Sequence, residues 1–247
     1  MHILDDPTGL STRARNLLER TGWRERPHDL QVSTEHLQAR DCRGRLIPPP
    51  MLLVIRREGF EYKYAGLRYR VRRSLTFNGE RHERVHDWHY DLGRCLWADP
   101  NGGGYFDWIG ERVSSPVRYL IHTDGRVGVE DGNAVFLEAA PSINALIESH
   151  ALTDMVSDWD RSPSGADALH IARSLDGLED IPEASGPTVR WRLSQHVAVC
   201  ESQNWSSTEP RQWRAFIWCR GEAGHRQLEE ATALKRTGLP EPGTARR

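Results

Sequence analysis

The sequence predicts an α+β fold: an antiparallel β-sheet meander flanked by N-terminal helices and a closing helix, plus a smaller β-rich C-terminal lobe with a terminal helix. Three observations predict this class. Apolar residues recur at helical spacing before residue 66, their period changes to two from Leu67, and short turn sequences separate the strand candidates that follow. Strand candidates so close in sequence favour antiparallel neighbours.

The N-terminal segment predicts helices. The first covers residues 11–21, with Ser11 as N-cap and Gly22 just beyond its end. A short second helix is expected from residue 33 or 34. The prolines at 48–50 precede a third helix that ends at Gly66, because proline is tolerated in a helix's first turn. Its apolar face is assigned to Met51, Leu52, Ile55 and Tyr62.

The middle of the chain predicts the sheet. Leu67, Tyr69 and Val71 alternate with Arg68, Arg70 and Arg72, as in a half-buried strand. The dipeptide Asn78-Gly79 is typical of a two-residue hairpin turn. Further strands are expected at residues 75–77, 85–90, 95–98, 105–109, 117–122, 126–130 and 134–137.

A closing helix begins after Ser142, its expected N-cap, and completes a first domain over residues 1–152. Residues 153–187 are acidic and rich in proline and glycine, which predicts a linker containing one helix at 166–175. Residues 188–240 predict the C-terminal lobe, with strands at 188–193, 196–201 and 212–220 and a helix at 223–235. Residues 241–247 are expected to form a disordered tail.

Composition narrows the functional classes. The 247 residues carry a formal net charge of -2, which argues against binding polyanions with the whole surface. Cys42, Cys95, Cys200 and Cys219 form no C-x-x-C pair, so neither a disulfide scaffold nor a thiolate zinc site is expected. No apolar run is long enough to span a bilayer, and the N-terminus does not resemble a signal peptide. We therefore expect a cytoplasmic protein with reduced thiols, no membrane association and no cofactor, whose oligomeric state stays open.

The sequence contains no complete motif for a metal site, a phosphate-binding loop or a catalytic nucleophile. His82, His86 and His89 have metal-ligand spacing for a helix, but a strand would put His89 on the opposite face from the other two. Glycines 102–104 lack the lysine of a phosphate-binding loop. Ser114 and Ser115 lack a nucleophile elbow. No metal or catalytic site is predicted; the enzyme alternative would place one at the junction of the two lobes, around His86, His89 or Asp107.

Charge is unevenly distributed along the chain. Residues 56–84 carry nine basic and four acidic side chains, whereas residues 124–183 carry thirteen acidic and three basic ones. The basic segment indicates either a solvated strand face or a docking patch of Arg68, Tyr69, Arg70, Arg72 and Arg73. The patch would bind an acidic protein or, as the alternative, single-stranded nucleic acid by stacking and phosphate contacts. The acidic segment is either a solvated linker or a mimic of an acidic ligand.

Four segments in the first 152 residues carry a resemblance to a known family. Residues 17–24 read as a helix end followed by Gly-Trp, residues 60–67 as an aromatic helix ending in Gly-Leu, Asp124-Gly125 as a turn before a strand, and residues 140–148 as a closing strand and helix. In this order they resemble the SUKH superfamily, chiefly its bacterial immunity-protein branch. The chain departs from that pattern at Ala65, which replaces a usual glycine, in a long insert between residues 73 and 91, and throughout residues 153–247.

The resemblance implies a non-catalytic binding module. Proteins of this kind are cytosolic neutralisers of toxins from neighbouring cells, or scaffolds that recruit partners. The family has no catalytic residues to carry over, and its partner surfaces vary too much to transfer. The resemblance thus implies a protein partner such as a toxin domain, rather than a nucleic acid.

Overall fold

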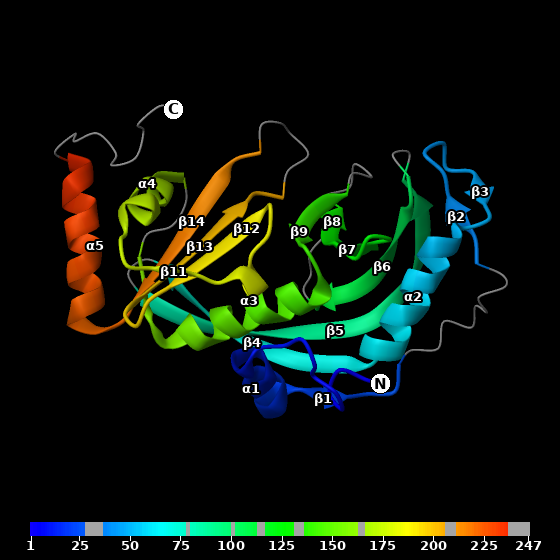
Figure 1. Ribbon diagram of the computed structural model, residues 1–247, viewed down its shortest axis with the longest axis horizontal. Helices are drawn as coiled ribbons and strands as arrows, with labels where there is room; N and C mark the ends of the chain where they lie inside the picture. The colour runs from blue at the N-terminus through cyan, green and yellow to red at the C-terminus, as the bar shows by residue number, and fades with distance from the viewer. Residues whose placement is uncertain are drawn as a thin grey trace.

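The computed structural model describes residues 1–27, 37–77, 80–99, 102–112, 117–130, 136–162, 166–205 and 211–236. The protein has the predicted α+β class, with two mainly antiparallel sheets and five α-helices in this part of the chain (Figure 1). The expected short helix from residue 33 or 34, the Asn78-Gly79 turn, Ser114, Ser115 and the expected tail at 241–247 lie outside the described residues. No helix in the described ranges is both long and apolar enough to cross a membrane.

The first sheet is the predicted meander. Its strands follow the order β1-β4-β5-β6-β7-β8-β9, with the short pair β2 and β3 attached beside β5. Its longest strands, β4 and β5, pair in register from Leu67 opposite Tyr90 to Phe77 opposite Glu80. The strands are β1 (Trp23–Arg24), β2 (Ala39–Arg40), β3 (Leu46–Ile47), β4 (Leu67–Phe77), β5 (Glu80–Ala98), β6 (Gly104–Glu111), β7 (Arg118–His122), β8 (Val127–Glu130) and β9 (Leu137–Ala140).

Three strand predictions change. The strand expected from Leu67 and the one expected at 75–77 are a single strand, β4. The strands expected at 85–90 and 95–98 are parts of β5, because two register shifts let it keep pairing with β6 past Asp91 and Gly93. The last strand of the meander, expected at 134–137, runs from Leu137 to Ala140, and Leu137 pairs with Val129 of β8; residues 134 and 135 lie outside the described residues.

The second sheet is the predicted C-terminal lobe, and it takes in more of the chain than expected. Its order is β10-β14-β13-β12-β11, all antiparallel, from β10 (Asp160–Arg161), β11 (Glu179–Asp180), β12 (Val189–Leu193), β13 (Val197–Gln203) and β14 (Trp213–Cys219). Both edge strands come from the segment predicted as a linker. That segment is therefore part of the second sheet, and its expected helix is α4 (Ala166–Ser174).

Helix α3 (Ile143–Met155) connects the two sheets (Figure 1). Ser142 caps it as predicted, accepting a hydrogen bond from the amide of Ala145. Ile147 belongs to the core of the first sheet, whereas Leu152 belongs to a second core with Trp191 and Trp218. The opposite face of the second sheet is covered by α4 and by α5 (Gly221–Arg236), which share a third core with β13 and β14.

Helix α1 (Thr12–Thr21) lies against α3, and its predicted N-cap is correct. The Ser11 hydroxyl accepts from the amide of Ala14, and its own amide and hydroxyl donate to the buried Glu148 carboxylate of α3, each at 2.6 Å. Arg13 adds a hydrogen bond to the same carboxylate at 3.1 Å. One buried acid of the acidic segment thus fixes the first helix.

Helix α2 (Met51–Tyr64) has the predicted position but the opposite orientation. The side chains buried in the structure are Leu53, Arg57, Phe60 and Tyr64. Met51, Leu52, Ile55 and Tyr62, the predicted inner face, are between 56% and 72% exposed. Phe60 decides the orientation, because it enters an aromatic core with Tyr90, Phe106 and Trp108, at ring-centroid distances of 5.7 to 6.3 Å.

Candidate functional site

The predicted arginine patch on β4 is largely neutralised inside the protein. The register places Arg68, Arg70 and Arg72 on one face of the strand, as predicted. Arg68 is only 4% exposed and is held between Asp91 and Glu25, the latter 3.2 Å from its Nε. A guanidinium in that position cannot reach a partner.

Arg70 and Arg72 are also paired. Arg70 Nε lies 3.1 Å from Asp87, and its guanidinium lies 5.2 Å from the centre of the Trp23 ring. Arg72 contacts Asp154 and Asp158, each at 3.4 Å, and its backbone amide donates to Asp154 at 2.8 Å.

The other two patch residues face the opposite way. Tyr69 is fully buried, and its hydroxyl hydrogen-bonds to the hydroxyl of Tyr90 at 2.8 Å and to Nδ1 of His150 at 2.7 Å. Burial raises the pKa of the Tyr69 hydroxyl well above its ordinary value. Tyr69 therefore cannot stack on a base, and Arg73 lies on the same side of the sheet, apart from the other arginines. The five residues do not form one docking surface, which corrects the prediction.

The basic and acidic segments contact each other. Asp154 also accepts from Arg20, and Arg81 donates to the carbonyl of Asp158 at 3.1 Å. Asp154 and Asp158 of the acidic segment thus join α3 and the turn after it to Arg72 and Arg81 of the β4–β5 hairpin.

The histidines do not converge. His86 hydrogen-bonds through Nδ1 to Glu111, His82 lies near Glu80, and His89 is on the other face of β5. Burial opposes ionisation of Glu111, but the bond from His86 and the charge of Arg73 hold its pKa below the ordinary value. No group of three His, Cys, Asp or Glu side chains in the described ranges could hold a metal ion.

Asp107 and His89 line a cavity of about 820 Å³ beside Arg68 and Asp91, on the first sheet and away from the second. Burial raises the pKa of Asp107, although the amide of Cys95 donates to it at 2.8 Å. Burial, and then the charges of Arg68 and Arg112, lower the pKa of His89. A cavity does exist between the two sheets, but His86, His89 and Asp107 do not line it.

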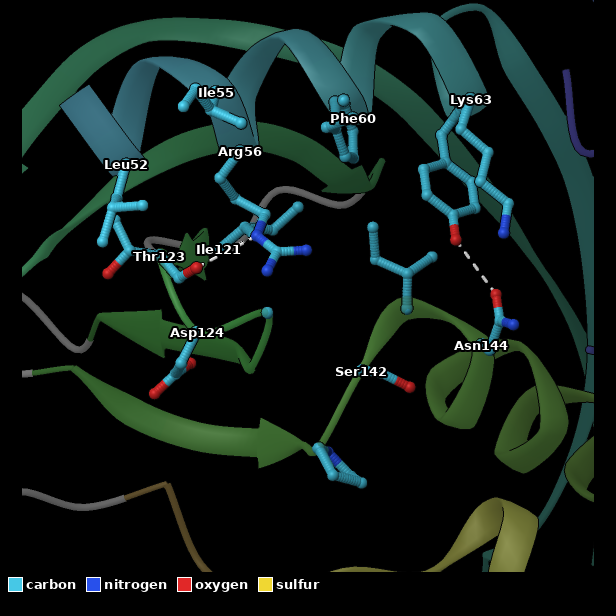
Figure 2. A pocket seen from close by; sticks show the side chains of 15 residues that line it. Leu52, Ile55, Arg56, Phe60, Lys63, Ile121, Thr123, Asp124, Ser142 and Asn144 are labelled. Carbon is cyan, nitrogen blue, oxygen red and sulfur yellow. Dashed lines mark hydrogen bonds between the residues drawn. The ribbon is translucent and has the colours of Figure 1, made fainter. Parts of the chain in front are cut away.

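A groove beside α2 is another candidate surface site. Its volume is about 580 Å³, and it lies between α2, the β7–β8 turn and the start of α3 (Figure 2). Leu52, Ile55 and Phe60 form its wall on α2, with Ile121 and Ile143 opposite. The Tyr64 hydroxyl, which donates to Asn144 at 3.0 Å, closes one end.

Two cations enter this groove without an acidic partner. Arg56 extends from α2 and donates through Nε to the carbonyl of Thr123 at 3.0 Å, while Lys63 points down from the same helix (Figure 2). Neither forms an ion pair with any residue that the structure describes. The acid lining the groove, Asp124, is engaged by Arg126 at 2.7 Å and by His122 at 2.9 Å. Although burial opposes it, these contacts hold the pKa of Asp124 below its ordinary value.

The exposed apolar side chains of α2 adjoin the groove. Met51, Ile55 and Tyr62 fall on one side of the helix, with Gly59 between the last two and Leu52 at the groove wall. A side chain added at Gly59 would meet no atom within 4 Å, so a partner can approach the helix backbone there. We call Met51, Leu52, Ile55, Gly59 and Tyr62 the α2 stripe.

The sequence carries a signal for the α2 stripe. Apolar residues follow helical spacing on two sides of this segment, through Met51, Ile55 and Tyr62 and also through Leu53, Phe60 and Tyr64. A helix with apolar residues on opposite sides is expected to be covered on both. No family model, curated protein or solved structure that was compared with the chain matches it.

Proposed function

We propose that the chain is a non-catalytic protein-binding module that holds its partner on the α2 stripe and in the groove beside it. The resemblance to the SUKH superfamily supplies the finer part of the proposal: a cytoplasmic bacterial immunity protein that neutralises a toxin by direct binding. The observation that carries the binding role is the stripe itself, four large apolar side chains that are each more than half exposed on one helix. Contiguous exposed apolar surface of this kind is characteristic of protein interaction sites.

The groove specifies the chemistry of the partner. Arg56 and Lys63 add positive charge beside apolar walls, and the amide end of α3 adds a partial positive charge. The partner is therefore expected to present an apolar segment flanked by acidic side chains. Burying apolar side chains would supply the affinity, and the two cations would set orientation and association rate.

The test first expresses the products of the genes on either side of this one and takes as the candidate partner a domain that is toxic when expressed alone; finding no such domain would count against the immunity role. Isothermal titration calorimetry should show binding by the wild-type chain and at least about a hundredfold weaker binding by the Leu52→Asp/Ile55→Asp double variant. The control is Val85→Asp, which places one such negative charge on an exposed apolar residue of β5. Control binding should equal that of the wild type.

Each alternative outcome has a clear meaning. Undiminished binding by the double variant would exclude the α2 stripe as the interface. Failure of the wild-type chain to bind or protect against that domain would overturn the immunity role. A wild-type dimer that Ile55→Asp converts to a monomer, seen by light scattering, would make the stripe a self-association surface instead.

A further inference from the structure

The space between the two sheets is a second site, separate from the α2 stripe. Two adjoining cavities of about 240 and 520 Å³ share the lining residues Arg73, Ser149, Thr153, Cys200 and Phe216. They lie where α3 passes between β4 of the first sheet and β13 and β14 of the second. We call the pair of cavities the inter-sheet cavity. Its size is within the range of small-molecule sites.

Three arginines line the inter-sheet cavity, the exposed Arg214 and the less exposed Arg73 and Arg161, and the latter two have few partners among the described residues. Arg161 donates through Nη1 to the carbonyl of Ser74 at 3.2 Å, and among the described residues no acceptor is bonded to its Nε or Nη2. It forms no ion pair within the described part of the chain. Arg73 has one carboxylate nearby, Glu111, at 3.7 Å from Nη1, and His86 already hydrogen-bonds to that oxygen.

The two arginines act on each other and on their surroundings. Burial, and then the charge of Arg73, lower the pKa of Arg161. Burial, followed by the charge of Arg73, also depresses the pKa of His150, so this lining histidine is neutral at pH 7. Glu138 is the one acid among the described lining residues, and Arg126 lies 3.3 Å from it. The cavity is therefore positively charged.

Several polar atoms around the cavity also lack protein partners. Ser74 is 5% exposed and Thr188 is buried, yet neither hydroxyl makes a hydrogen bond with a described residue. The indole nitrogen of Trp88 is in the same situation. Buried polar groups are normally satisfied, so these groups along one cavity can form hydrogen bonds with water or with a bound molecule.

The second sheet supplies aromatic walls. Trp191 and Trp218 stack with ring centroids 5.5 Å apart, and Phe216 lies 6.3 Å from Trp218. Arg161 lies over Phe216 at 4.9 Å, which holds its guanidinium at the junction between the aromatic wall and β4. Burial raises the pKa of the Cys200 thiol to about 12, so this side chain contributes a neutral wall.

We infer that the inter-sheet cavity binds a small aromatic oxyanion, with its carboxylate or phosphate between Arg73 and Arg161 and its ring against Phe216, Trp218 and Trp191. Arginine is suited to this role because its planar group donates paired hydrogen bonds to such oxyanions. The ring would replace water along an apolar wall, and the hydroxyls of Ser149 and Thr153 would lie at the side of the oxyanion.

The experiment measures quenching of tryptophan fluorescence, with calorimetric confirmation. The probes are phenylacetate, benzoate and phenyl phosphate, each against a neutral analogue such as phenylacetamide. Comparing the affinities of the carboxylate probes with that of phenyl phosphate shows which of the two oxyanions the cavity prefers. At least one aromatic oxyanion should bind, about tenfold or more tighter than its neutral analogue, because hydrogen bonds to charged groups dominate the difference.

Variants localise the binding. Arg161→Gln and Arg73→Gln should each weaken binding of the best probe by about tenfold or more. Arg70→Gln is the matched control, since it removes the same charge from the opposite face of the same strand and should leave binding unchanged. Circular dichroism of each variant confirms that it is folded.

Three results would overturn the inference: no probe binding at millimolar concentration, equal binding of the acid and its neutral analogue, or unchanged binding in both cavity variants. Binding of inorganic phosphate as tight as that of phenyl phosphate would remove the aromatic part of the assignment. None of these outcomes depends on the α2 stripe, so the proposed protein-binding role is tested separately.

Discussion

Strand β4 has arginines on both faces, and the two faces differ in what surrounds them. On one face Arg68, Arg70 and Arg72 each contact at least one carboxylate at 3.4 Å or closer. On the other, Arg73 shares the inter-sheet cavity with Arg161, which has no acidic partner among the described residues. Arginine therefore forms ion pairs within the protein on one face, whereas on the other face its guanidinium lines a cavity and can contact a bound molecule. What separates the two cases is the position of carboxylates from distant parts of the chain.

The largest expected effect tests the buried pair on the first face. Arg68→Ala should lower the free energy of unfolding by about 3–5 kcal/mol, because it leaves the buried Asp91 carboxylate unpaired. Arg70→Ala, on the same face but exposed, should cost about 0–1 kcal/mol. Urea unfolding at pH 7 measures both. Equal losses of unfolding free energy in the two variants would mean that the buried ion pair of Arg68 contributes no more to stability than the exposed ion pair of Arg70.

A smaller effect tests the contact between the basic and acidic segments. Asp154 is 2% exposed and accepts hydrogen bonds from Arg20 and from the Arg72 amide. Asp154→Ala should reduce the free energy of unfolding by about 2–3 kcal/mol. Asp158→Ala, which removes an exposed carboxylate of the same cluster, should change it by no more than about 0.5 kcal/mol. An equal loss of unfolding free energy in Asp158→Ala would contradict the expectation that the buried carboxylate is the more important one for stability.

The incompletely neutralised charge of Arg73 should appear in the pH dependence of stability. The pKa of His150 is depressed in the folded state by burial first and by Arg73 second, so between its ordinary value of 6.5 and its folded value the unfolded chain binds more protons. Stability is therefore complete above pH 6.5 and falls as the pH decreases towards the folded pKa.

Arg73→Gln should make that fall shallower without abolishing it, because burial remains. Urea midpoints between pH 7.5 and 5 provide the measurement, and the window stays above the pH at which Glu111 contributes. His2 and His89 also have depressed pKa values, mainly through burial, and contribute to the slope. Comparing the variant with the wild type isolates the effect of Arg73. An unchanged slope would show that burial alone keeps the folded pKa of His150 below this window.

The smallest effect on stability is expected at Arg161. Because it has no acidic partner among the described residues, Arg161→Met should change the free energy of unfolding by no more than about 0.5 kcal/mol in the absence of ligand. The matched control is Arg192→Met in the same sheet, where a 2.7 Å contact with Glu201 is lost, and a cost of about 2 kcal/mol is expected. A large loss at Arg161 would assign it a structural role.

Local patterns were sufficient for much of the fold. The switch from helical to alternating spacing at Leu67 located β4, and Ser11 and Ser142 were correct as helix caps. These features depend on near neighbours in the chain, since capping and strand alternation act over a few residues. The segment at 153–187 was misjudged because β10 and β11 are two residues each, too short to show a period.

The candidate sites depended on contacts that no local pattern shows. The inner face of α2 was misassigned because both of its sides are apolar, and only the aromatic core around Phe60 selects one. Likewise the cavity between the sheets combines Arg73 of β4 with Arg161 and Phe216, residues that are far apart in the sequence.

By itself the sequence determined the α+β class, the order of its main elements and the number of arginines available, because spacing and composition are properties of the chain alone. Tertiary structure decided which arginines are neutralised and which side of α2 is exposed. Charge pairing and burial fall off over a few ångströms in space, and residues as distant in sequence as Arg72 and Asp154 become neighbours only when the chain folds.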